Sequence, residues 1–216
     1  AQFQHDIANL VEPIFMGEPT LRPLALALQN DVNEKLKAQG SLPLSFYPSP
    51  RDHNNPASGF AQSAYPPRFS TGYWALRNRL AILVETHSWK DYPWRVKSTK
   101  NLIVALAENP ARQGRRWREV AHQADQACSS LDGRPLTLTY KTTDKQEIID
   151  FQGYAYKFEP SEISGGKALR YDPKTPQVWK VPLFPEVVAD LQIAAPKGGY
   201  LIPAAHAAWL KTRLDA

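Results

Sequence analysis

The stretch Leu80-Ala81-Ile82-Leu83-Val84-Glu85-Thr86-His87 decides the fold class of this chain. A continuous apolar run of this length is too short for a typical helix, and it ends in a charged residue. Such a run is typical of a strand that is buried on both faces in a mostly parallel sheet. We therefore expect an α/β fold around residues 80–86, with Glu85 near the carboxyl end of the strand.

Helical patterns flank this strand. Leucines and a valine recur at spacings of three and four over residues 19–39, which predicts a helix that Gly40 ends. Residues 72–79 can form a short helix or turn. Two further helices are predicted over residues 95–108 and 111–129, separated by Asn109-Pro110, because proline disfavours a helical interior.

Six prolines interrupt residues 43–69, at positions 43, 48, 50, 56, 66 and 67. These prolines, together with Gly59 and nearby Asp and Asn residues, exclude a long regular element. Loops of this length in compact domains are usually functional or disordered. Five aromatic residues in the segment favour order, so we expect a structured surface loop near a site.

The pattern changes after residue 130. Segments rich in β-branched and aromatic residues, separated by turn signals, predict strands: 136–140, 147–151, 154–158 and 178–184. The last helix is expected over residues 204–214. The sequence thus predicts two domains, an α/β unit over residues 1–129 and a β-rich domain over residues 130–216.

Composition excludes several classes of protein. The net charge of +5 is spread along the chain, and its densest basic cluster, Arg112–Arg118, lies in a helical pattern with few aromatic residues, so we do not expect nucleic-acid binding. No apolar run approaches the length of a membrane span. The single cysteine, Cys128, excludes an intrachain disulfide and a cysteine-rich zinc site. The oligomeric state stays open.

Glu85 is the residue with the clearest chemical potential. A charge that closes an apolar strand is costly in the core without a partner, whereas the carboxyl end of a strand is where open α/β sheets place their ligand crevices. A carboxylate beside an apolar wall holds a proton more tightly, as a general base requires. Strand periodicity puts His87 on the same face. The structural alternative is a salt bridge from Glu85 to Arg77, Arg79 or Lys90.

The segment Pro67-Arg68-Phe69-Ser70-Thr71-Gly72-Tyr73-Trp74-Ala75-Leu76-Arg77-Asn78-Arg79, followed by Leu83-Val84-Glu85-Thr86-His87, resembles the C-terminal half of the catalytic domain of bacterial zinc carboxypeptidases of the metallocarboxypeptidase family. The resemblance covers roughly residues 1–105. It implies the C-terminal part of a mixed-sheet domain, followed here by the β-rich domain. It also implies peptide hydrolysis with zinc as cofactor and a periplasmic or secreted location.

The resemblance gives roles to individual residues. Glu85 occupies the position of the general base, Tyr73 resembles a mobile substrate-binding tyrosine, for which Tyr65 competes, and His87 and Arg77 are further candidates for substrate binding. The family binds zinc through a His-x-x-Glu pair and a later histidine, which are expected upstream of this segment. The chain has no His-x-x-Glu, and His5 falls a few residues after the third ligand position. We therefore expect no metal ligands in this chain, and no activity from the chain alone.

Two alternatives stay open. The same scaffold could serve a deacylase that cleaves an acylated amino acid, and the upstream arginines that would discriminate are not in this chain. A non-catalytic module that binds cell-wall polymers or other glycans is the other alternative. It would be centred on aromatic residues of the β-rich segment: Tyr154, Tyr156, Phe158, Tyr171 and Trp179.

Overall fold

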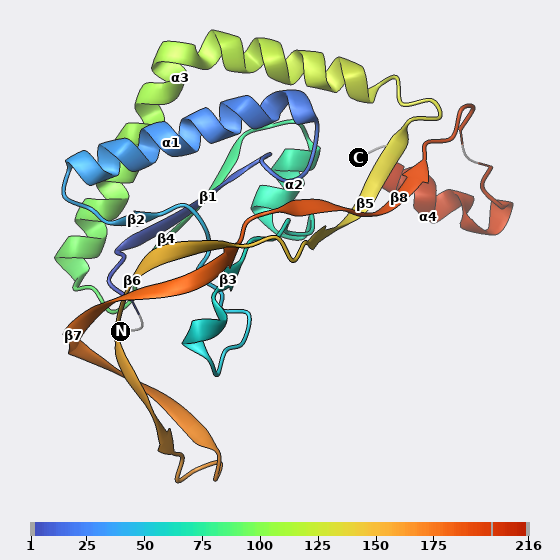
Figure 1. Ribbon diagram of the computed structural model, residues 1–216. Coiled ribbons are helices and arrows are strands. Elements are labelled where there is room, and N and C mark those ends of the chain that lie inside the picture. The colour runs from blue at the N-terminus through green and yellow to red at the C-terminus, as the bar shows by residue number, and fades with distance from the viewer. Residues whose placement is uncertain (1–2, 200, 215–216) are drawn as a thin grey trace.

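The computed structural model describes residues 3–199 and 201–214 (Figure 1). Its central sheet has three strands in the order β2-β1-β4. The middle strand β1 (Ile7–Glu12) pairs in parallel with β2 (Pro43–Leu44) and antiparallel with β4 (Ala81–Thr86). The sheet is therefore mixed, and together with the helices it confirms the general α/β class.

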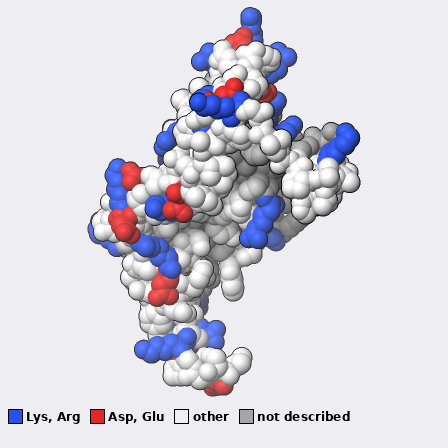
Figure 2. Space-filling view, turned by 90° about the vertical axis from the view of Figure 1, so that its right-hand side faces the viewer, with Lys and Arg blue, Asp and Glu red and all other residues white. Residues whose placement is uncertain are grey.

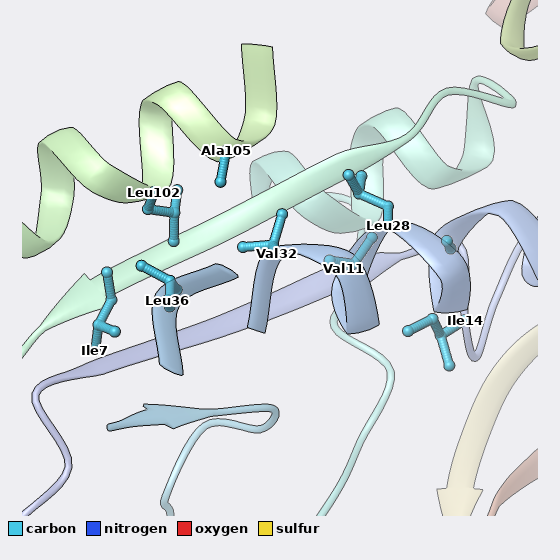
Figure 3. Packing of buried hydrophobic residues seen from close by; sticks show 9 residues of the cluster. Ile7, Val11, Ile14, Leu28, Val32, Leu36, Leu102 and Ala105 are labelled. Atoms are coloured by element: carbon cyan, nitrogen blue, oxygen red, sulfur yellow. The ribbon is translucent and has the colours of Figure 1, made fainter. Parts of the chain in front are cut away.

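Two helices cover one face of this sheet (Figure 1). The first is α1 (Arg22–Ala38), preceded by the short 3-10 helix η1 (Pro19–Leu21), so the helix predicted over residues 19–39 is confirmed. The second is α3 (Tyr92–Cys128). Figure 3 shows the core between these layers, to which α1, α3, β1 and the segment after β1 contribute apolar side chains: Ile7, Val11, Ile14, Leu28, Val32, Leu36, Leu102 and Ala105.

The predicted break in α3 is wrong, because the helix continues through Pro110 and bends in its middle (Figure 1). Proline removes one helical N–H and clashes with the preceding turn, which bends a helix. The Asn109 side chain supports this turn, since its Nδ2 donates to the Ala105 carbonyl at 3.0 Å and to Asp31 of α1 at 2.8 Å. Side-chain bonds to a neighbouring helix thus hold the bend in place.

The chain from 130 onward is rich in strands, as predicted. A long hairpin of β6 (Glu147–Pro160) and β7 (Lys167–Phe184) extends beyond the body of the protein (Figure 1). The strands β5 (Pro135–Thr142) and β8 (Val187–Ala194) form a second antiparallel pair. The helix α4 (Ala204–Leu214) matches the predicted range 204–214.

The β-rich segment shares a core with the first 129 residues. The short strand β3 (Phe60–Ala61) pairs in parallel with the end of β7, next to the 3-10 helix η2 (Pro56–Ser58). Phe151, Val181 and Leu183 are buried together with Ala8, Leu44, Phe46 and Phe60. The second face of the central sheet is therefore covered partly by the hairpin base and partly by the proline-rich loop of residues 43–69. The division into two domains at residue 130 stays a prediction.

The strand β4 is confirmed, but its surroundings differ from the expectation. It pairs antiparallel with β1 rather than within a parallel sheet, and its apolar residues Ala81–Val84 are half-buried rather than buried on both faces. Within the described part of the chain, β4 lies at the end of its sheet, so one edge of its backbone is unpaired. The short helix α2 (Ser70–Leu76) precedes it, in place of the helix or turn predicted over 72–79.

Packing of α3 against this sheet should dominate stability, and two adjacent residues test this. Leu102 is 1% exposed whereas Ile103 is 58% exposed. We expect Leu102→Ala to lower the free energy of unfolding by about 2–5 kcal/mol, because it leaves a cavity in the core. Ile103→Ala should change it by less than about 1 kcal/mol. Urea unfolding monitored by circular dichroism measures both, and equal losses would contradict this assignment of the core.

Candidate functional site

Glu85 lies in a pocket on the face of the sheet opposite to α1 and α3. In the β1–β4 pair, Ala8 stands opposite Glu85, and Ala8 belongs to the core on that second face. The pocket has a volume of about 320 Å³. We call it the Glu85 pocket, and its walls combine aromatic, histidine and small side chains: Phe3, His5, Ile7, Ala8, Leu44, Tyr47, Pro48, Glu85, Thr86, His87, Ser88 and Trp89.

The carboxylate of Glu85 is exposed at the rim of this pocket. Within residues 3–199 and 201–214, it forms no ion pair within 4 Å and no hydrogen bond, so the alternative of a structural salt bridge is not observed. Arg79, one candidate partner, donates two hydrogen bonds of 3.0 Å to Asp125 of α3 instead. The apolar burial that we expected around Glu85 is absent among the described residues, which leave this side chain exposed.

His87 shares the pocket with Glu85, as strand periodicity predicts. Its ring lies 4.4 Å from the ring of Phe3, and its Nδ1 accepts the backbone N–H of Trp89 at 3.4 Å. Burial lowers the pKa of His87, and the charge of Lys90 adds to this effect. The imidazole is therefore neutral at pH 7.

His5 also lines the Glu85 pocket, although the sequence placed it only near a ligand position of the family. It is 7% exposed, its ring lies 4.7 Å from that of Phe151, and its Nδ1 has no hydrogen-bond partner among the described residues. Burial lowers its pKa to about 4, against the opposing charge of Asp6. The pocket thus presents two neutral histidines beside an exposed carboxylate.

A second hollow adjoins the first at Tyr47, which lines both. It lies beside the second half of β1, between α1 and the proline-rich loop, and it includes Glu12, Arg22 and Tyr65. Burial raises the pKa of Tyr65, and the negative charge of Glu85 contributes to the same shift. Tyr65 is therefore a protonated phenol at neutral pH and lies within electrostatic reach of Glu85.

Tyr73 and Arg77, the other candidates for substrate binding, do not line the Glu85 pocket. Tyr73 is 48% exposed on α2, and its ring contacts that of Trp74. Arg77 is exposed just after α2, and its carbonyl accepts a hydrogen bond from Arg79. Of the two tyrosines that competed for this role, Tyr65 lines the hollow that adjoins the Glu85 pocket, whereas Tyr73 lines neither of the two. Tyr47 was missed, although the aromatic content of the proline-rich loop pointed to its neighbourhood.

The described residues contain no group of three or more His, Cys, Asp or Glu side chains that could hold a metal ion. The donors of the described residues therefore do not fit a zinc site, and ligands from outside the chain stay a prediction.

None of the described helices is long and apolar enough to cross a membrane. On the face shown in Figure 2, basic and acidic side chains lie close together in several places rather than forming one basic surface.

No protein-family model matches the chain, and neither a curated protein nor a solved structure matches it.

The buried His5 makes stability depend on pH. Its pKa is about 4 in the folded chain and 6.5 in the unfolded chain, so the unfolded state binds more protons between these values. The free energy of unfolding should fall as pH decreases through this window, by about 3 kcal/mol at pH 4. Asp6, His87 and Lys90 are the charged or titratable groups that act on it.

The variant His5→Phe isolates this effect, because phenylalanine keeps the contact with Phe151 but cannot be protonated. Urea unfolding at pH 7 and pH 4.5 should show a smaller loss of stability for this variant than for the native chain. An identical loss in both proteins would show that His5 does not titrate as described.

Proposed function

We propose that this chain supplies the general-base half of a zinc-dependent carboxypeptidase, and that polypeptide outside the chain supplies the zinc ligands. The observation that carries the proposal is the position of Glu85, an unpaired carboxylate at the end of β4 that opens onto a pocket with neutral histidines. The resemblance of residues 67–87 to the metallocarboxypeptidase family gives the reaction class. The same resemblance supports a periplasmic or secreted location.

In this proposal, Glu85 takes a proton from the water that attacks the scissile amide and later passes it to the leaving nitrogen. A zinc ion, when bound, lowers the pKa of water and polarises a carbonyl group. An unpaired Glu85 suits the role of base, since an ion pair with Arg79 or Lys90 would reduce its affinity for a proton. The neutral state of His5 and His87 removes two positive charges that would have the same effect.

The substrate of such a site is a peptide with a free C-terminus, and a deacylase on the same scaffold is the alternative. Both reactions use Glu85 in the same way, and the residues that would hold a substrate carboxylate separate them. Arg22, which lines the second hollow, is a candidate for such a role.

The glycan-binding alternative has weaker support. Aromatic rings of the hairpin do form a row, but they pack on one another: Trp179 stacks on Phe151 at 5.7 Å and meets Tyr156 edge-on at 5.5 Å. The Trp179 Nε1 also donates to the Tyr154 carbonyl at 3.1 Å. These ring contacts occupy surface that sugar stacking would need, and of the five candidate rings only Phe158 is exposed, at 46%.

The central test is Glu85→Gln in the assembled, zinc-loaded enzyme. Loss of the base should lower kcat by about 10²–10⁴-fold, with zinc content unchanged, because glutamine cannot accept the proton. Glu147→Gln, an exposed position at the start of β6, is the matched control and should leave kcat unchanged. Near-normal turnover of Glu85→Gln would reject the proposed function.

A second test separates the two tyrosines. Tyr65→Phe should raise KM about fivefold, the effect of losing one hydrogen bond of about 1 kcal/mol, because the Tyr65 phenol lies beside the site. Tyr73→Phe, on the exposed side of α2, should leave KM unchanged. Steady-state kinetics on a short peptide measures both variants, and the reverse order would restore Tyr73 as the substrate-binding tyrosine.

A further inference from the structure

The unpaired edge of β4 adjoins an exposed part of α3. A hollow at the end of β4 is lined by Thr86 and by side chains from the first half of α3: Tyr92, Arg95, Val96, Thr99, Lys100, Ile103 and Val104. We call this surface, together with the unpaired backbone of residues 81–86, the β4 edge surface. It lies on the strand that carries Glu85.

The helix side of this surface is apolar in a regular row. Tyr92, Val96 and Ile103 follow one another at helical spacing, and they are displaced around the axis by about a quarter turn from the buried Leu102. A second apolar stripe beside the buried one is typical of a helix that covers more than the strands present. Ile103 is 58% exposed, so this stripe has no covering layer among the described residues.

The strand β4, on the other side of this surface, also lacks a covering element among the described residues. The residues Ala81–Val84 are apolar yet only half-buried, and the outer backbone groups of β4 have no strand beside them in the described chain. Natural proteins usually protect such an edge with charges, prolines or a bulge. Residues 81–84 carry none of these, and β4 pairs with β1 without a register shift. An added strand would satisfy this backbone and bury both apolar rows.

Charge specifies the partner further. Arg95 is half-buried beside the edge, its Nε is buried without a hydrogen-bond partner, and its guanidinium lies 5.8 Å from the ring of Tyr92. Within the part of the chain that the structure describes, neither Arg95 nor Lys100 forms an ion pair. A partly buried guanidinium without an ion pair is best satisfied by a carboxylate, which its planar fork of N–H groups matches.

We propose that the β4 edge surface binds a β-strand that carries an acidic side chain opposite Arg95, and that this strand belongs to the zinc-bearing polypeptide. The second part rests on the proposed function, whereas the binding surface itself does not. Backbone hydrogen bonds along β4 supply affinity, and the Arg95 pair and the aliphatic row on α3 supply register. The added strand would lie next to β4 and so bring its own residues beside Glu85.

Peptide titration of the isotope-labelled chain tests the surface. The probe is a capped seven-residue peptide that alternates valine and threonine around a central aspartate, and its matched control has lysine at the centre. The aspartate peptide should shift the amide resonances of residues 81–86, slow their hydrogen exchange, and bind at least tenfold more tightly than the lysine peptide. Binding of neither peptide, or shifts confined to other elements, would overturn the proposal.

Two variants and one control locate the contacts. Arg95→Glu should reverse the preference, so that the lysine peptide binds more tightly, and Ile103→Glu should weaken both peptides at least fivefold. Val178→Glu, on the hairpin and 52% exposed, should change nothing. An unchanged preference in Arg95→Glu would exclude the acidic partner. Self-association of the chain that protects residues 81–86 without peptide would assign the edge to a second copy and overturn the proposal.

The outcome is separable from that of the proposed function. Glu85→Gln should bind the aspartate peptide as the native chain does, because the pairing uses the backbone of Glu85 and not its side chain. Peptide binding combined with normal turnover of Glu85→Gln would leave the surface standing and reject the function. Loss of turnover in Glu85→Gln, combined with no peptide binding by the native chain, would support the proposed function and overturn the proposed binding surface.

Discussion

The buried carboxylate of Asp6 joins the segments that create the site. It accepts the backbone N–H of Leu42 at 2.7 Å and the indole N–H of Trp94 at 2.9 Å, while the Asp6 carbonyl accepts the N–H of His87 at 3.0 Å. One residue therefore connects the start of β1, the entry to β2, the first turn of α3 and the exit of β4. Because charge-assisted hydrogen bonds are strong in a buried setting, this junction fixes where the chain leaves β4 and hence where His87 lies.

The pairing of β1 with β4 places the apolar core residues on one face of the sheet and Glu85 on the other. Ile7, Val11, Ile82 and Val84 point to the helices and form the main core. The alternate positions, which include Ala8 and Glu85, point to the hairpin base and the proline-rich loop. A shift of one residue in this register would exchange the two sets and place Glu85 in the core. Because the face toward the helices must be apolar, the strand register keeps the Glu85 carboxylate on the opposite face.

The sequence predicted those elements whose signal is local. The helix over 19–39 follows from leucine spacing, and the strand around 80–86 follows from its apolar run. The range 204–214 predicted for the last helix also matches α4. Features that depend on distant partners were not predictable. The helix α3 passes Pro110 because Asp31, far away in sequence, holds Asn109. The antiparallel partner of β4 was likewise invisible in the residues of β4 itself.

The same distinction applies to the candidate site. Strand periodicity, which is local, predicted that Glu85 and His87 lie on one face of the strand, and both line the Glu85 pocket. The choice between Tyr65 and Tyr73 required the path of the proline-rich loop, which depends on the pairing of Phe60 with Leu183 more than a hundred residues later. The burial of His5 was likewise not predictable from sequence, because the ring packs against Phe151 of the hairpin.

The exposure of Glu85 and the unpaired edge of β4 have one physical origin in the proposed assembly. An exposed carboxylate is screened by water, and electrostatic catalysis requires that water be excluded from the reacting groups. In the proposed assembly this chain would supply one wall of such a site, with His5 and His87 kept neutral by burial. A strand added at β4 would lie on the open side of Glu85 and supply the second wall. Completion of the sheet and desolvation of the base would then occur in the same binding step, so that activity would depend on assembly.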